Sequence, residues 1–350
     1  MIVKRMMWGL IVVLLCVMPV LGQDMTPDDA YQEALRLIEE ARVSRADVLH
    51  LSAIGIETVP PEVSQLTHLR WMNINDNHLT AFPTEILSLT QLEGLNLTGN
   101  QLTTLPPEIT QFKNLEFFDI TYNQFTVLPP WIGQISHLQE LYLNGNQLET
   151  VPPEIGQLSH LQALSIGDNQ LTSLPPEIGQ LTLLEELYIS GNQITELPPE
   201  IGQLTNLQMF RLSYNQVTQL PSGLGQLVNL QQLDLSSNRL TTLPPDIGQL
   251  TALYYLNIEN NPPMTLPVEM GHLTGLETFV AGPLAYPSPD IQKKGWPIMR
   301  AYLHGQEKRF MRQARQTIAA AASCIGAVAG LLLAFRWRQR RGLGEKKKRL

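Results

Sequence analysis

A strict repeat of 23 residues constrains the fold of this chain more than any other feature of its sequence. The pattern L-x-x-L-x-L-x-x-N-x-L-x-x-L-P-P-E-I-G-Q-L-x-x recurs without insertion or deletion, as ten units and a degenerate eleventh over residues 46–284. The first unit carries Ile54 where the asparagine is due. A fixed period of this length is typical of a solenoid built from stacked units. The repeated asparagines are Asn77, Asn100, Asn123, Asn146, Asn169, Asn192, Asn215, Asn238 and Asn261.

One unit, residues 138–158, indicates how each repeat folds. Leu138, Leu141 and Leu143 supply the inward side chains of a short strand and of its approach. The apolar residues of one unit are too few for a closed core, but stacked units bury them against each other. Pro152 and Pro153 exclude a long helix on the outer side, because proline lacks an N–H donor and restricts the residue before it. We therefore predict a parallel sheet on one side and extended or 3-10 segments on the other.

We interpret the repeated asparagine as a structural residue. A buried side-chain amide has two donors and an acceptor that must find partners. Stacked at identical positions, each amide can bond the backbone of its own turn and of the next. The nine asparagines are therefore predicted to form a structural ladder inside the solenoid.

The unit LxxLxLxxNQLTxLPPEIGQL resembles the leucine-rich repeat, in the 23-residue class of the Ras-suppressor, scribble and plant intracellular Ras-group-related proteins and of bacterial relatives. The resemblance implies an α/β-type solenoid, a leucine-rich repeat horseshoe with a concave parallel sheet and a polyproline II or 3-10 convex side. To this fold class we add one C-terminal transmembrane helix.

Segments on both sides of the repeats are predicted to cap the solenoid, because its open ends expose apolar cross-sections. Residues 23–45 are predicted to contain an N-terminal capping helix, and residues 285–316 a C-terminal cap and juxtamembrane helix. The apolar stripe expected on the first is Ala34, Leu35, Ile38 and Ala41, and the residues expected to cover the last repeat are Ile298, Tyr302 and Phe310.

The two termini have the composition of membrane-directed segments. Residues 1–22 combine Lys4 and Arg5 with an apolar run and small residues before a cleavage point, which predicts a secretory signal peptide, or an uncleaved anchor as the alternative. Residues 317–335 contain no charge and predict a transmembrane helix in contact with lipid. The basic residues 336–350 then predict a cytoplasmic tail and a single-pass protein with its repeats outside the cytoplasm. Gly326 and Gly330 are spaced for a homodimer of such helices.

The charge of the repeat region excludes several classes of function. Residues 46–292 carry 24 acidic and 4 basic side chains, a net charge of −20, which disfavours nucleic acid. The same residues contain no cysteine, and the seven histidines form no HExxH motif. His137 and His160 are expected on adjacent turns, but two imidazoles without a third ligand make a poor metal site. We predict no enzyme activity, no cofactor and no metal.

Large aromatic side chains gather at the variable positions of the predicted sheet face. Six of the nine tyrosines of the chain fall there, and such side chains often dominate binding interfaces. Many acidic residues share this face, which favours a protein or peptide partner with basic groups. The alternative is that aromatic residues simply suit strands. The predicted partner-binding residues of this concave face are Trp71, Phe117, Tyr122, Tyr142, Tyr188, Arg211, Tyr214, Tyr254 and Tyr255.

These observations predict a membrane-anchored, non-catalytic protein that recognises a protein or peptide through its concave face. Two alternatives remain open at this stage. One is a structural or adhesion protein of the cell envelope, and the other is a cytoplasm-facing signalling scaffold tethered to the membrane.

Overall fold

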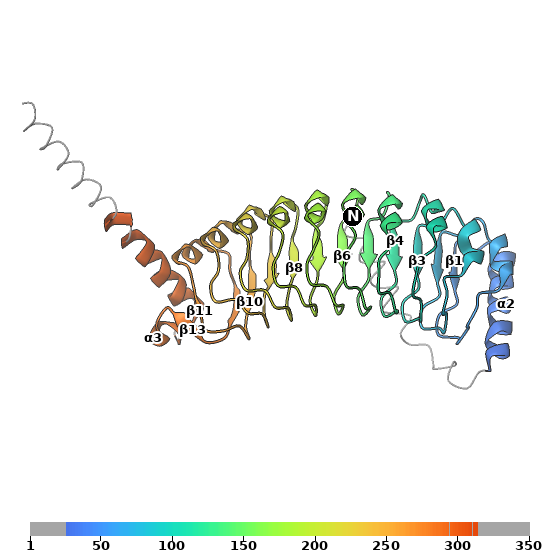
Figure 1. Ribbon diagram of the computed structural model, residues 1–350, viewed down its shortest axis with the longest axis horizontal. Coiled ribbons are helices and arrows are strands. Elements are labelled where there is room, and N and C mark those ends of the chain that lie inside the picture. The colour runs from blue at the N-terminus through green and yellow to red at the C-terminus, as the bar shows by residue number, and fades with distance from the viewer. Residues whose placement is uncertain (1–25, 294, 310, 314–350) are drawn as a thin grey trace, which may run out of the picture.

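The structure, a computed structural model, describes residues 26–293, 295–309 and 311–313. Its repeats follow one another along a single axis in chain order (Figure 1). Within the described residues, eleven strands form one parallel sheet, which confirms the predicted solenoid. The strands are β1 (Val48–His50), β2 (Trp71–Asn73), β3 (Gly94–Asn96), β4 (Phe117–Asp119), β5 (Glu140–Tyr142), β6 (Ala163–Ser165), β7 (Glu186–Tyr188), β8 (Met209–Arg211), β9 (Gln232–Asp234), β10 (Tyr255–Ile258) and β12 (Thr278–Ala281).

Each strand pairs with the next one residue for residue. Leu141 in β5, for example, lies opposite Leu164 in β6, and Tyr142 lies opposite Ser165. The middle residue of a strand points into the core, and Leu141 and Leu164 are fully buried. The first and third residues point to the opposite face because side chains alternate along a strand. The constant period therefore aligns equivalent side chains in straight rows across the sheet.

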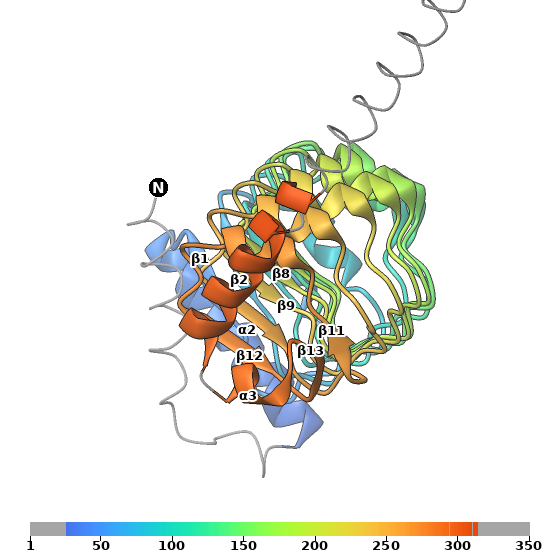
Figure 2. The same cartoon turned by 90° about the vertical axis from the view of Figure 1, so that its left-hand side faces the viewer.

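The outer side of each repeat carries a five-residue 3-10 helix. Most of these helices have a proline at their first position, where the missing N–H leaves no unpaired donor. Viewed along the solenoid, the strands lie on one side of the coil and the short helices on another (Figure 2). The helices are η2 (Pro61–Gln65), η3 (Thr84–Ser88), η4 (Pro107–Gln111), η5 (Pro130–Gln134), η6 (Pro153–Gln157), η7 (Pro176–Gln180), η8 (Pro199–Gln203), η9 (Ser222–Gln226), η10 (Pro245–Gln249) and η11 (Val268–His272).

Helix α2 (Pro27–Ser44) covers the first repeat (Figure 1). It begins at a capping box, in which the Asp29 backbone N–H donates to Thr26 Oγ1 over 3.2 Å. Its buried side chains recur every three or four positions, as expected for one face of a helix. They are Ala30, Ala34, Ile38 and Ala41, while the predicted Leu35 is only half-buried.

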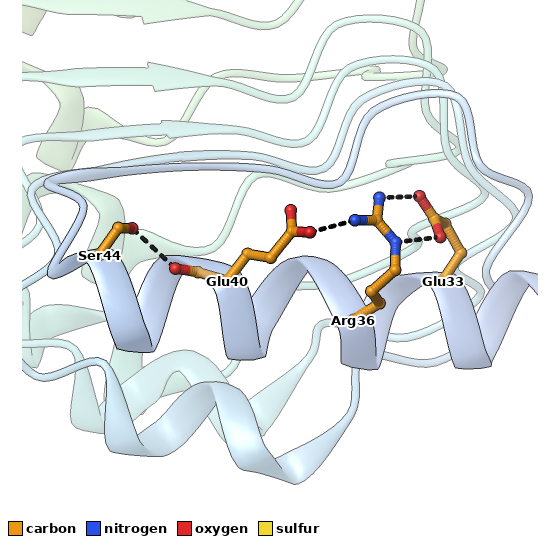
Figure 3. A network of polar contacts seen from close by, with 4 residues as sticks. All are labelled: Glu33, Arg36, Glu40 and Ser44. Carbon is orange, nitrogen blue, oxygen red and sulfur yellow. Dashed lines mark hydrogen bonds and ion pairs between the residues drawn. The ribbon is translucent and has the colours of Figure 1, made fainter.

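A polar network covers the exposed side of α2 (Figure 3). The Arg36 guanidinium donates to both Glu33 and Glu40, with 2.6 Å between Arg36 Nη2 and Glu33 Oε1. Ser44 Oγ donates to the Glu40 carbonyl over 2.7 Å. The hydrogen bond from Arg36 lowers the pKa of Glu33. Because these groups are exposed, their ion pairs contribute little to the stability of the cap.

The C-terminal end is covered by strands β11 (Met264–Thr265) and β13 (Leu284–Tyr286), by helix α3 (Pro289–Gln292), and by a further helix over residues 296–309. The face of this last helix differs from the predicted one. Ile298 is 47% exposed, whereas Tyr302 is half-buried and packs against the core as predicted, and Phe310 lies outside the described residues. The helix instead buries Trp296, Met299 and Leu303, which share one face through their spacing of three and four residues.

The predicted fold class and location need a correction. We expected a transmembrane helix over residues 317–335 and, from it, a single-pass membrane protein. In the part of the chain that the structure describes, no helix is both long enough and apolar enough to cross a bilayer, and neither expectation is retained. The 18-residue helix α2, for example, carries charged side chains along its exposed face. Residues 1–22, 317–335 and 336–350, with Gly326 and Gly330, lie outside the described residues.

Candidate interaction surface

The first and third residues of the strands form two rows of side chains on the sheet face. The first row includes Trp71, Gly94, Phe117 and Glu140, one from each of four consecutive repeats. The second row, formed by the third residues, places Asp119, Tyr142 and Ser165 beside them. Because these positions do not contribute to the core, their side chains are the variable part of the surface.

Three of the predicted aromatic residues lie in contact, and we call Trp71, Phe117 and Tyr142 the aromatic strip. The ring centroids of Trp71 and Phe117 are 5.0 Å apart, and those of Phe117 and Tyr142 are 5.5 Å apart. Trp71 and Phe117 are two repeats apart, and Gly94 stands between them. A Cβ atom at Gly94 would lie 1.9 Å from the Trp71 ring, so the absent side chain is what lets the indole reach Phe117.

Polar neighbours fix the orientation of the strip. Trp71 Nε1 donates to Asn73 Oδ1 over 3.1 Å, and the Tyr142 hydroxyl donates to Glu140 Oε2 over 2.8 Å. Burial raises the pKa of Tyr142, and the negative charge of Glu140 raises it further. Tyr142 therefore stays a neutral hydrogen-bond donor at physiological pH. All three side chains are half-buried, so each remains partly accessible to solvent.

Carboxylates surround the strip. Glu116 is exposed and Glu140 half-buried, while Glu93 forms an ion pair with Arg70. Asp119 accepts a hydrogen bond from the Thr121 backbone N–H over 2.9 Å. Burial nevertheless raises the pKa of the Asp119 carboxyl, because the hydrogen bonds offset the loss of hydration only in part. This part of the sheet face therefore combines apolar rings with negative charge.

A second group lies further along the sheet. The Arg211 guanidinium lies over the Tyr188 ring, 5.4 Å from its centroid. The Tyr188 hydroxyl donates to Glu186 Oε2 over 2.9 Å, and Met209 Sδ is 3.1 Å from it. Tyr188 and Arg211 are thus held together, but they form a site separate from the aromatic strip.

The remaining predicted residues are dispersed. Tyr122 and Tyr214 do not stand on the strands but in the turns that follow them, with φ values of 52° and 54° and exposures of 63% and 68%. Tyr254 precedes β10 and accepts a hydrogen bond from Gln232, while Tyr255 is half-buried in β10. The nine predicted residues therefore do not form one continuous surface.

The asparagine ladder lies inside the solenoid. In Asn169, Nδ2 donates to the carbonyls of Leu143, Ile166 and Gly167 over 2.9–3.3 Å, and Oδ1 accepts from the Leu148 N–H over 3.0 Å. Leu143 and Leu148 belong to the preceding repeat, not to the next one as we expected. The equivalent asparagines are buried, apart from the half-buried Asn261 at the end of the series.

A cluster that the sequence analysis missed lies at the C-terminal cap, where His272, His304 and Glu307 come together. The spacing of His304 and Glu307 on a helix was the only signal in the sequence. His272 is too far away in the chain for spacing alone to include it. His137 and His160, which we expected on adjacent turns, stack with 5.8 Å between ring centroids.

A family model described as a leucine-rich repeat region matches residues 48–151, 151–216 and 201–294. The chain belongs to the leucine-rich repeat family. No curated protein matches it in sequence.

Several solved leucine-rich repeat structures resemble this protein. The ectodomain of the membrane receptor kinase GASSHO1/SCHENGEN3 from Arabidopsis thaliana, in complex with Casparian strip integrity factor 2, is 33% identical over 65% of this chain and 29% of that chain, with a TM-score of 0.59. The plant peptide hormone receptor RGFR1, in complex with RGF2, is 30% identical over 70% of this chain and 41% of that chain, with a TM-score of 0.62.

A bacterial structure is similar as well. The functional domain of InlJ from Listeria monocytogenes is 25% identical over 74% of this chain and 62% of that chain, with a TM-score of 0.59. This leucine-rich repeat protein thus spans less than two thirds of the length of each of the three. Its fold is one on which receptor ectodomains bind proteins and peptides.

Proposed function

We propose that this leucine-rich repeat protein is a non-catalytic recognition module that binds an extended peptide, or a protein segment, on its sheet face. Family membership favours binding over catalysis. The single observation that carries the proposal is the aromatic strip, because Trp71, Phe117 and Tyr142 form a continuous half-exposed apolar surface among charged neighbours. Rigid aromatic side chains bind at low entropic cost, since they have few rotamers to lose.

The charges around the strip indicate the chemistry of the partner. Glu116, Asp119 and Glu140 lie beside or between the rings, and they favour lysine or arginine in the ligand. Burial raises the pKa of the Asp119 carboxyl, and a cation bound beside it would lower that pKa again. The ligand we propose therefore pairs apolar or aromatic side chains with neighbouring basic ones.

Display of random linear peptides tests this proposal directly. The full chain is immobilised, the enriched peptides are sequenced, and a synthetic consensus peptide is measured by calorimetry. We expect the consensus to combine basic with apolar residues. The double variant Phe117→Ala and Tyr142→Ala should lose about 2 kcal/mol of binding free energy or more, roughly a thirtyfold loss in affinity.

Two further variants separate the contributions. Glu116→Gln with Glu140→Gln should weaken binding and reduce its dependence on salt, since these carboxylates attract the basic groups. Tyr31→Ala on α2 is the matched control, because Tyr31 is also half-buried but lies away from the sheet face. If no consensus emerges, or if the consensus peptide binds the double variant as well as the original chain, the sheet face is not the recognition surface. A structural role would then be the better account.

A further inference from the structure

Three side chains with metal-binding atoms meet where the last repeat contacts the C-terminal helix. His272 ends η11, and His304 and Glu307 lie on the helix over residues 296–309. His272 Nε2 is 2.7 Å from Glu307 Oε2, and His304 Nδ1 is 3.7 Å from the same oxygen. One ligand atom from each residue lies within 4.8 Å of the other two.

Gly271 holds the two parts of this cluster together. In the repeats before it, the equivalent glycine faces the next repeat, and a Cβ atom at Gly248 would lie 2.4 Å from the Glu269 carbonyl oxygen. At Gly271 the helix takes the place of a further repeat, and a Cβ atom would lie 2.7 Å from His304 N. The absence of a side chain therefore lets the helix approach closely enough to place His304 beside His272.

His304 Nδ1 is a donor or acceptor without a partner. It is buried and makes no hydrogen bond to any of the described residues, and its 3.7 Å separation from Glu307 Oε2 exceeds hydrogen-bond length. An unpaired buried nitrogen costs free energy. A bound cation would remove this cost by accepting the lone pair of the neutral imidazole.

We propose that His272, His304 and Glu307 bind one zinc ion, with water as the fourth ligand. Imidazole and carboxylate suit zinc, whereas magnesium and calcium prefer oxygen ligands alone. Zinc–ligand distances of 2.0–2.2 Å in a tetrahedron correspond to ligand atoms about 3.3–3.6 Å apart. The separations of 2.7 and 3.7 Å lie on either side of that range, and all three ligand atoms lie within 4.8 Å of one another, so we expect side-chain rotation to complete the site.

The zinc ion would link the last repeat to its cap. The three ligands come from two elements, and the two helical ligands are three residues apart on one helical face. The His272 and His304 side chains are each 42% exposed, which leaves a route for the ion and room for a water ligand. Because zinc would bind only when the helix is docked on the last repeat, its binding would stabilise this end of the solenoid.

Zinc titration of the untagged full chain tests the site. The chain is first freed of metal by dialysis against a chelator, and binding is then followed by calorimetry. We expect one zinc ion per chain, and we expect His272→Ala and Glu307→Gln each to lower the affinity at least about tenfold. Zinc should also slow amide hydrogen exchange in residues 296–309 of the original chain and not in these variants.

The exposed pair His137 and His160 provides the matched control. The double variant His137→Ala and His160→Ala should bind zinc as the original chain does. Circular dichroism reports whether each variant is folded. If His272→Ala is unfolded, zinc binding by Glu307→Gln tests the proposal, because the glutamine amide keeps the shape of the carboxylate. The proposal is overturned by a chain that binds no zinc, by zinc binding that both cap variants retain, or by its loss in the control.

Discussion

At the scale of single residues, the repeated asparagine adds side-chain hydrogen bonds to the backbone hydrogen bonds that join neighbouring coils. Each Asn169-like amide donates to carbonyls in two repeats and accepts an N–H from the preceding one. These backbone groups follow the strand, and the Gly167 carbonyl also accepts the Gly145 N–H over 3.0 Å. The side chain therefore completes the hydrogen bonding of the solenoid interior at positions that the parallel sheet leaves open.

Replacing Asn169 with alanine tests this role. The change leaves the Leu148 N–H and three carbonyls without their present partner, which should cost about 1–3 kcal/mol in the free energy of unfolding. Urea denaturation measures the loss. The control is Asn206→Ala, which removes one exposed hydrogen bond to the Thr182 carbonyl and should change stability by less than about 0.5 kcal/mol. Equal losses in the two variants would contradict the structural interpretation.

A second residue-scale prediction concerns Asp119. Because burial raises its pKa in the folded state, the folded chain holds this proton more tightly than the unfolded chain does. The resulting stabilisation is present below about pH 3.9, the ordinary pKa of aspartate, and is lost as the pH rises through the raised value. Asp119→Asn cannot ionise, so its stability relative to the original chain should increase with pH. Denaturation curves between pH 3 and 7 measure this difference in stability. A difference that does not change with pH would show that folding does not raise the pKa of Asp119.

At the scale of elements, the short helices on the outer side pack through glycine. A Cβ atom at Gly179 in η7 would lie 2.6 Å from the Glu200 carbonyl oxygen of η8. Similar approaches recur at Gly156 and Gly225. The small residue therefore sets how closely successive 3-10 helices can stack.

Gly179→Ala should consequently destabilise the chain by about 1–3 kcal/mol, because backbone atoms must move to admit the methyl group. Gly305→Ala is the control: no atom lies within 4 Å of its added Cβ, and its helical position predicts a gain of about 0.5–1 kcal/mol. Thermal unfolding of both variants gives the sign of each effect. A Gly179→Ala variant as stable as the original chain would show that the outer helices are not closely packed.

The elements also show how much the sequence could predict. The 23-residue period was enough for the solenoid and its parallel sheet, because identical apolar positions can be buried only by stacking. The buried face of the C-terminal helix was not predictable in the same way, since Trp296 and Ile298 are both apolar and no repeat sets their direction. The same limit applies to the site: the period placed Trp71 and Tyr142 on one face, but contact with Phe117 depends on the missing side chain of Gly94.

At the scale of the whole molecule, the constant register makes one repeat exchangeable for another. Deletion of residues 182–204 removes one full period and joins Leu181 to Thr205, so each remaining strand still meets an equivalent neighbour. We expect a folded chain with a single unfolding transition at a slightly lower temperature, because one interface between repeats is lost. Deletion of residues 182–203 is the control. It shifts the pairing by one residue, exposes buried side chains and should abolish cooperative unfolding. Calorimetry distinguishes the two, and similar behaviour of both chains would argue against the repeat as the unit of stability.

The one-to-one pairing of the strands also sets the spacing at which a ligand lying across the sheet meets successive repeats. Successive strands are about 4.8 Å apart, whereas an extended chain advances about 3.3 Å per residue. A ligand crossing the sheet would therefore advance about three residues for every two repeats. The rings of Trp71 and Phe117 belong to strands two repeats apart but are themselves only 5.0 Å apart, so one large apolar side chain of such a ligand could contact both.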